Sequence, residues 1–272
     1  MDWPELPYEA WSATKETLHM QIQMLGKLRL TLAPPEPEWA HIPLYVTARG
    51  LNSSPIPHPN GVFDLDVDFV DHVVSIRTVA GAVERIRLEP RTVADFYAEL
   101  MRALERAGVP AQINAVPSDV PNGIPFPEDA VHVSYDAEWA RRFWRVLVAV
   151  DSVLKEHRAR FVGKTFPVSF WWGSFDLSYS RFSGRGSEHA SVGFWPGDER
   201  HRQAAFYAYT VPRPEGIEEA VPGWHTGLGE FVLPYDEVRS AADPRAALLD
   251  FAETTYRAGA ELAGWPTELV SA

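Results

Sequence analysis

Two series of short strand-like segments, each without a helix between its members, constrain the fold more than any other feature of the sequence. The first series comprises Ile42–Ala48, Val62–Phe69, His72–Val79 and Val83–Leu88, and the second lies near Val168–Phe182, Ser191–Trp195, Ala204–Val211 and Gly229–Leu233. Consecutive strands joined by short turns pair antiparallel, because a parallel pair needs a long crossover connection. The pattern therefore predicts an α+β protein with mainly antiparallel sheet rather than a doubly wound parallel sheet.

Helical periodicity flanks both series of strands. The predicted helices are Tyr8–Leu30, Thr92–Ala107, Asp136–Phe161 and Pro244–Leu262. In the first of them, one stripe of the helix holds Trp11, Leu18, Ile22 and Leu25, which is typical of an amphipathic helix. The chain thus reads as two similar helix–four-strand–helix halves, residues 1–120 and 121–272, related by an internal repeat. Ala111–Val116 is expected to add a strand, and the proline-rich segment Pro117–Asp129 to link the halves.

The composition excludes several classes of function. The 272 residues include 25 Lys and Arg against 37 Asp and Glu, a formal net charge of −12, and no cysteine. An acidic chain repels nucleic acid and anionic membrane surfaces, so neither is an expected partner. Without cysteine there is no disulfide, thiolate nucleophile or Cys-ligated metal, and no targeting pattern or membrane-length apolar run is present. We therefore expect a cytoplasmic protein; no motif for a cofactor is present, and none is expected.

The first candidate site lies on the opening helix. Lys15 and His19 are four residues apart and flank the stripe that contains Trp11. A lysine and a histidine beside tryptophan could bind an anion or exchange protons near neutral pH. The alternative is a lysine that extends to solvent and a histidine held by a structural hydrogen bond.

A second candidate follows the acidic strand Phe63–Phe69. Asp64, Asp66 and Asp68 alternate with apolar residues and share one face. Together with His72 at the next turn, such carboxylates could hold a cation, which leaves a His/Asp metal-dependent hydrolase as an alternative function. A solvated outer face accounts for the same pattern, and no metal site is assigned.

The strongest candidate is the segment from Pro167 to Arg185. If it were one continuous strand, Trp172, Ser174 and Asp176 would share a face with Phe170, while Arg181 would take the other face. Arg185 ends this segment, and Trp195 follows shortly after. Aromatic rings beside arginine suit a small anionic or aromatic ligand, whereas the alternative is an aromatic core with a structural ion pair.

A weaker counterpart in the first half consists of Trp39, His41 and Arg49. Taken together, the residues suggest an aromatic-walled polar cleft that binds a small molecule. Possible general acid/base catalysis falls to His19 or His72 together with Asp176. A non-catalytic binding or protein-interaction module is the remaining alternative.

Several longer strings resemble an uncharacterised bacterial family that is catalogued only as a domain of unknown function. They include Leu44-Tyr-Val-Thr47, Trp172-Gly-Ser-Phe-Asp-Leu177, Gly193-Phe-Trp-Pro-Gly197 and Phe206-Tyr-Ala-Tyr209. The resemblance covers nearly the whole chain. It implies one full-length unit and brings no reaction or catalytic residue with it.

Overall fold

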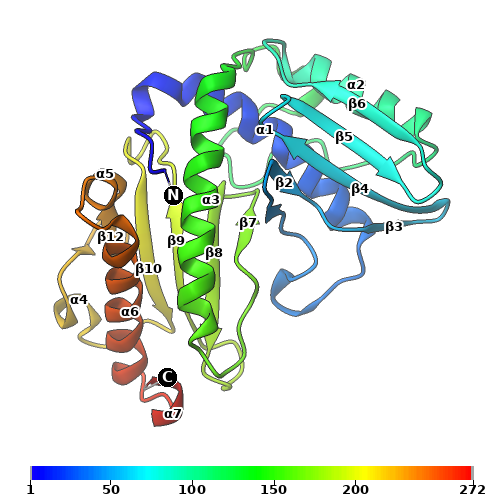
Figure 1. Ribbon diagram of the computed structural model, residues 1–272. Helices are drawn as coiled ribbons and strands as arrows, with labels where there is room; N and C mark the ends of the chain where they lie inside the picture. Colours follow the sequence, from blue (N-terminus) through cyan, green and yellow to red (C-terminus); the bar gives the residue numbers. More distant parts are fainter. Residues whose placement is uncertain (1, 271–272) are drawn as a thin grey trace. The chain divides into compact units, whose positions relative to one another are not determined.

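Two antiparallel sheets form the framework of the computed structural model, which describes residues 2–270 (Figure 1). Each sheet has six strands among these residues, and helices precede and follow each series of strands along the chain. The predicted α+β class with antiparallel pairing is confirmed.

The first sheet has the strand order β1-β2-β4-β5-β6, with β3 paired to β4. Its strands are β1 Tyr45–Val46, β2 Gly50–Asn52, β3 Ile56–His58, β4 Gly61–Asp68, β5 Val73–Thr78 and β6 Val83–Arg87. The side chains of β4 alternate, so Phe63, Leu65 and Val67 are buried. On the opposite face, the carboxylates of Asp64 and Asp66 form ion pairs with Arg77, at 2.9 and 3.5 Å. The acidic strand is therefore an ion-paired face.

The helices around this sheet end where the local sequence signals predict. They are α1 Tyr8–Leu32 and α2 Val93–Arg106, with short 3₁₀ turns η1 at Pro37–Trp39 and η2 at Phe126–Glu128. Thr92 caps α2, since its side chain accepts the backbone N–H of Asp95. Helix α1 buries more than the predicted apolar stripe. Its polar side chains Gln23 and Lys27 are also buried, and both donate hydrogen bonds to Ser118.

The second sheet has the strand order β11-β12-β10-β9-β8-β7. Its strands are β7 Ser169–Trp171, β8 Asp176–Phe182, β9 His189–Trp195, β10 Ala205–Val211, β11 Trp224–His225 and β12 Glu230–Pro234. The accompanying helices are α3 Ala137–Ala159, α4 Ile217–Ala220, α5 Tyr235–Arg239, α6 Pro244–Leu262 and α7 Thr267–Val270. Helix α6 packs on β9 and β10, so it covers one face of the sheet.

Two predicted strands are wrong in detail. Ala111–Val116 forms no strand, because its backbone pairs with none of the strands found between residues 2 and 270. The expected single strand Val168–Phe182 is interrupted by a turn between β7 and β8, where Phe175 adopts a left-handed φ of 60°. The turn breaks the alternation of side chains, so Trp172 and Ser174 do not share a strand face with Asp176.

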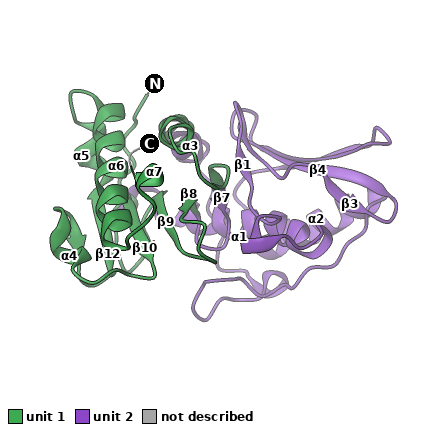
Figure 2. Cartoon of the chain, turned by 90° about the horizontal axis from the view of Figure 1, so that it is seen from below, with its two compact units in different colours: residues 1–8, 145–169, 176–272 green, residues 9–144, 170–175 purple. Residues whose placement is uncertain are grey.

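The chain divides into two compact units, and neither is continuous in sequence (Figure 2). Unit 1 consists of residues 1–8, 145–169 and 176–272, and unit 2 of residues 9–144 and 170–175. The boundary expected at residue 120 differs from this partition. The segment expected to be a linker is instead bound into unit 2, where η2 packs on α2 and Ser118 exchanges two hydrogen bonds with Gln23.

Among residues 2–270, none of the helices combines the length and the apolar composition that a membrane span requires.

Candidate functional site

The second sheet carries a polar face opposite the face that α6 covers. Strand alternation and register place Asp176, Ser178 and Ser180 of β8 on this face. From the neighbouring strands they are joined by Ser191 and Gly193 of β9, Tyr207 and Tyr209 of β10, and Glu230 of β12. Asp176, Ser178 and Ser191 are all less than a tenth exposed. All of these residues belong to unit 1.

Tyr207 reaches across a neighbouring strand to bind Asp176. The phenol O–H of Tyr207, on β10, donates a hydrogen bond to the Asp176 carboxylate on β8. Between them, on β9, lies Gly193, paired with both Tyr207 and Ser178. A Cβ atom at Gly193 would lie 2.5 Å from the Tyr207 oxygen and 2.7 Å from Ser178 Cβ. The contact therefore requires a glycine at residue 193.

Glu230 is the member of this group whose pKa lies close to neutral pH. Its burial, together with the nearby Asp176 carboxylate, raises its pKa from 4.5 to about 7. Burial and Asp176 also raise the pKa of Tyr207 well above its ordinary value, which keeps that phenol protonated. Glu230 in turn contributes to the raised pKa of Tyr209. The four side chains are thus one electrostatically coupled set.

Aromatic rings surround this set. Tyr207 and Tyr209 stack with ring centroids 6.1 Å apart and an interplanar angle of 7°. Trp195, at the end of β9, stacks on His201 at 5.5 Å, and His201 meets His225 edge-on at 5.9 Å. The polar face therefore combines titratable groups with flat apolar rings, which is the composition of many small-molecule sites.

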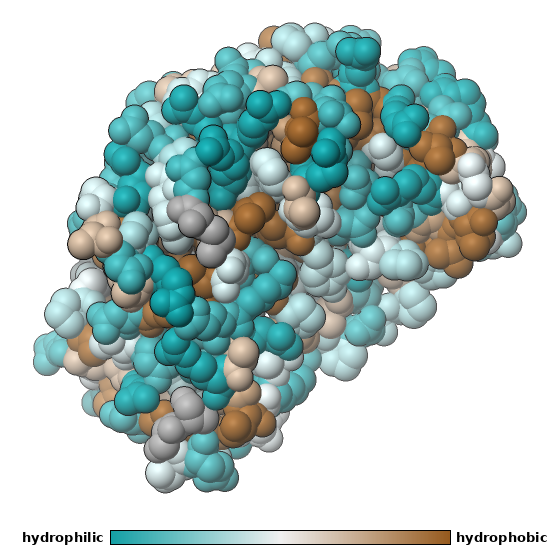
Figure 3. Space-filling model, viewed as in Figure 1, coloured by the Kyte–Doolittle hydropathy of each residue, from teal (hydrophilic) through white to brown (hydrophobic). Residues whose placement is uncertain are grey.

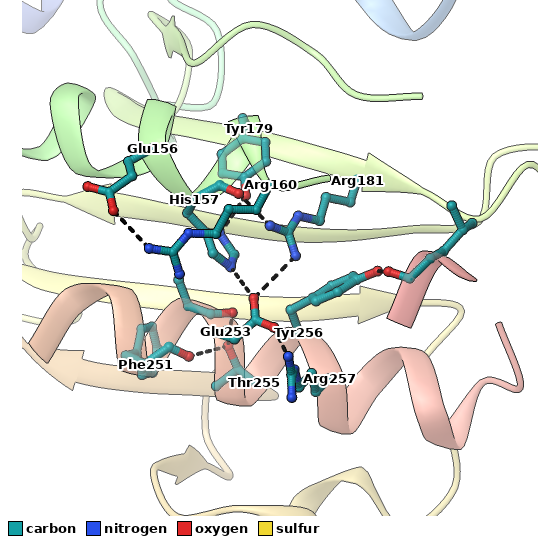
Figure 4. A network of polar contacts seen from close by, with 12 residues as sticks. Glu156, His157, Arg160, Tyr179, Arg181, Phe251, Glu253, Thr255, Tyr256 and Arg257 are labelled. Carbon is teal, nitrogen blue, oxygen red and sulfur yellow. Dashed lines mark hydrogen bonds and ion pairs between the residues drawn. The ribbon is translucent and has the colours of Figure 1, made fainter. Parts of the chain in front are cut away.

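The covered face of the same sheet holds a second polar network (Figure 4). His157 of α3 lies between Tyr179 of β8 and Glu253 of α6, with Nδ1 2.5 Å from the Tyr179 oxygen and Nε2 3.0 Å from Glu253 Oε2. Arg181 donates to the carbonyl of His157 at 2.5 Å and lies 3.6 Å from Glu253. Arg257 completes the set at 2.5 Å from the other oxygen of Glu253.

The Tyr179–His157–Glu253 arrangement resembles a catalytic triad, with a hydroxyl, an imidazole and a carboxylate in succession, but its tyrosine and histidine are buried in the protein core. A carboxylate only accepts, so Nε2 of His157 carries the hydrogen; burial lowers the pKa of His157, and the neutral ring then accepts from Tyr179. Hydrogen bonds from His157 and Arg257 lower the pKa of Glu253 to about 2. The cavity beside the network holds about 10 Å³, enough for one water molecule and not for a substrate. We read the network as structural.

In unit 2, His19 has a structural environment. Its Nε2 lies 3.0 and 2.9 Å from the carbonyl oxygens of Trp172 and Gly173, and burial with nearby Lys15 lowers its pKa to about 3. His19 is therefore neutral near pH 7 and fastens the turn after β7. Lys15 is buried on the same helix, and Trp172 is buried with its indole N–H donating to Ile42 O at 2.9 Å.

The other candidates of unit 2 are dispersed. Trp11 is buried in the core against Phe143, with ring centroids 5.0 Å apart. Trp39 is 63% exposed and stacks on His41, whose Nδ1 accepts the backbone N–H of Glu36. Arg49 pairs with Asp68 and Asp71 at 2.5 and 2.8 Å, and His72 Nδ1 lies 2.7 Å from the hydroxyl of Tyr135. These contacts do not converge on one point.

The remaining candidates separate in the same way. Ser174 is exposed in the turn between β7 and β8, and Arg185 is exposed and donates to Gly264 O at 2.6 Å. Arg181 lies on the covered face, away from Asp176. Of the residues singled out in the sequence, the structure therefore brings Asp176 and Trp195 to the polar face. Tyr207, Tyr209 and Glu230 were missed, although their alternation along β10 and β12 is visible in the sequence.

No group of three or more His, Asp or Glu side chains is arranged to hold a metal ion among residues 2–270. The metal-dependent alternative has no donor set in that part of the chain.

The fold and the polar face define an α+β protein with a candidate small-molecule site on an antiparallel sheet. No curated protein and no solved structure matches the chain. The chain belongs to a family of unknown function, DUF5996, whose model matches residues 3–272.

Replacing Gly193 tests the geometry of the polar face. The Gly193→Ala change places a methyl group against the Tyr207 ring and Ser178, so we expect a loss of about 1–3 kcal/mol in unfolding free energy from overpacking. Urea denaturation measures it. In a Tyr207→Leu background, the same change should cost less. An equal cost in both backgrounds would show that Tyr207 does not impose the glycine.

Proposed function

We propose that the protein binds a small aromatic molecule on the polar face of the second sheet and exchanges a proton with it through Glu230. The observation that carries the proposal is the Glu230 carboxyl, with a pKa of about 7, beside the Tyr207–Asp176 hydrogen bond. A general acid or base works best when its pKa is close to the working pH, and an ordinary glutamate does not meet that condition.

The division of roles follows from the contacts. Glu230 changes its protonation state near neutral pH, whereas Tyr207 stays protonated and donates to Asp176. Asp176 accepts from Tyr207, and because a carboxylate offers about four lone-pair sites it can also accept a hydroxyl or N–H group of a ligand. One carboxyl therefore moves a proton while the other orients the ligand.

The aromatic half of the sequence-based expectation fits this face better than the anionic half. Tyr209 and Trp195 offer flat ring surfaces, and two carboxyl groups would repel an anionic ligand at neutral pH. We therefore place the arginine candidates outside the site: Arg181 is committed to the buried network, and Arg185 is bound to Gly264.

A direct test uses the protein with acetophenone, an aryl ketone whose methyl protons exchange in heavy water when a base removes them. Wild-type protein should accelerate the exchange, with a rate that rises with pH about a midpoint near 7, because the Glu230 carboxylate is the active form. The Glu230→Gln variant should lose this acceleration, and Glu261→Gln, an exposed change on α6, should keep it. Exchange is followed by proton NMR.

The same variant pair supplies a readout independent of turnover. The ¹³C signal of the Glu230 carboxyl should titrate near pH 7 and be missing from Glu230→Gln. Because the folded-state pKa is raised, protonation favours the folded state below pH 4.5 and this contribution is lost as the pH rises through 7. A Glu230 midpoint near 4.5, or undiminished exchange in Glu230→Gln, would refute the proposal, as would failure of acetophenone to bind.

The interaction-module alternative has less support. The face of the molecule in Figure 3 is mostly hydrophilic, with apolar residues in small groups separated by polar ones. Exposed apolar side chains such as Val79, Val131 and Val162 are dispersed along the chain. Scattered apolar residues are ordinary on protein surfaces and do not mark an interface.

A further inference from the structure

A second pocket in unit 1 lies where the end of α4, strand β12 and helices α5 and α6 meet, and none of its residues belongs to the polar face. Its volume is about 380 Å³, within the range of small-molecule sites. Val221, Leu233 and Phe251 give it apolar walls, and each of the three is only half-buried. Val238, which is fully buried, lies behind them.

One stripe of α6 forms a wall of this pocket. Ala247, Asp250, Phe251 and Thr254 are spaced by three and four residues, so they share a single face of the helix. The stripe combines an aromatic ring with a carboxylate and a hydroxyl. Glu237 of α5 adds a second carboxylate to the lining.

The two carboxylates carry uncompensated negative charge. Among residues 2–270, neither the Glu237 nor the Asp250 side-chain carboxylate has a hydrogen-bond or ion-pair partner; Ser240 donates only to the backbone carbonyl of Glu237. The arginines of α5 and α6, and Arg213 in the loop before α4, are engaged in other ion pairs: Arg213 with Glu218, Arg239 with Asp236 and Glu5, Arg245 with Glu156, and Arg257 with Glu253. A pocket with apolar walls and two free carboxylates is complementary to a cation with an apolar body.

We propose that this pocket binds a primary amine attached to an aromatic or branched aliphatic body. An ammonium group has three N–H donors, and Glu237, Asp250 and the Thr254 hydroxyl offer three acceptors. The apolar body lies against Leu233 and Phe251. The site is separate from the proposed proton-transfer site, so the two proposals can fail independently.

Phenethylamine is the probe, compared by isothermal titration calorimetry with 2-phenylethanol and 3-phenylpropionate, which have a similar body and a neutral or anionic end. The amine should bind at least about tenfold more tightly than either analogue, a difference of about 1.4 kcal/mol. Added salt should weaken its binding, because the rim of the pocket is open to solvent. Amide chemical shifts should change at Phe251 and Thr254.

The variant Glu237→Gln/Asp250→Asn should weaken phenethylamine binding at least about tenfold while binding of 2-phenylethanol stays the same. Glu261→Gln, on the same helix outside the pocket, is the control for losing a carboxylate charge elsewhere and should bind the amine normally, as should Glu230→Gln. Equal affinity for the amine and the alcohol, undiminished binding by the double variant, or no binding of phenethylamine would overturn the proposal. Weaker binding by Glu230→Gln alone would assign the amine to the polar face instead.

Discussion

The Glu253→Gln variant is expected to lose about 3–5 kcal/mol of unfolding free energy, the usual cost of removing one partner from a buried ion pair. Arg181 is only 2% exposed, and its Nε and Nη1 atoms have no hydrogen-bond partner among the described residues 2–270. The Glu253 carboxylate is what balances its charge, at 3.6 Å. An amide at residue 253 can still accept from His157 but leaves the guanidinium uncompensated. Urea denaturation followed by circular dichroism measures the loss.

The pH dependence separates this effect from a general loss of packing. The folded-state pKa of Glu253 lies near 2, below its ordinary 4.5, so its contribution is present above pH 4.5 and is lost as the pH falls toward 2. Glu253→Gln should abolish that part of the acid sensitivity. Arg257→Gln, which removes an exposed partner of the same carboxylate, should cost at most about 1 kcal/mol. A loss in Glu253→Gln no larger than that in Arg257→Gln would contradict the structural role.

The second large effect is expected from Gly26→Ala in the C-terminal half of α1. A Cβ atom at Gly26 would lie 2.2 Å from the Trp172 ring, so the indole must move away from the helix. Alanine favours a helix over glycine by about 1 kcal/mol. Overpacking costs about 1–3 kcal/mol and the lost bond from the indole to Ile42 about 1 more, so the net change should be destabilising by roughly 2 kcal/mol.

Two comparisons isolate the tryptophan as the cause. In a Trp172→Phe background, Gly26→Ala should be much less harmful, because the smaller ring leaves room for the methyl group. Ala10→Gly, at an exposed residue of the same helix, calibrates the propensity difference without a packing change. If Gly26→Ala stabilised the protein by the amount that Ala10→Gly destabilises it, the close approach of Trp172 to the helix would be refuted.

Helices were predictable here because their signals are local. The Thr92 cap and the helical pattern from Pro244 place α2 and α6 within a residue or two of their observed bounds. Strands depend on partners distant in sequence, and that is where prediction failed. Ala111–Val116 has a strand-like composition but no partner, and the turn at Phe175 needs a left-handed backbone that its aromatic side chain does not announce.

The candidate site was only partly predictable for the same reason. Asp176 stands out in the sequence as a carboxylate within an aromatic segment, and Trp195 as an aromatic residue shortly after it. Their connection to Tyr207 and Glu230 depends on the register of β8, β9, β10 and β12, which brings together residues more than fifty positions apart. Gly193 was the available signal, because a glycine inside a strand often marks the close approach of another group.

The discontinuous partition of the chain has a consequence for its synthesis on the ribosome. Unit 2 is complete once residue 175 has been made, whereas unit 1 needs residues from both ends of the chain. Tyr235 donates to the carbonyl of Pro4 at 2.9 Å, and Arg239 pairs with Glu5 at 3.2 Å. Pro4 therefore has to wait until a residue 231 positions later has been translated before it finds its native neighbour. The unit that carries both proposed binding sites is the later of the two to be completed.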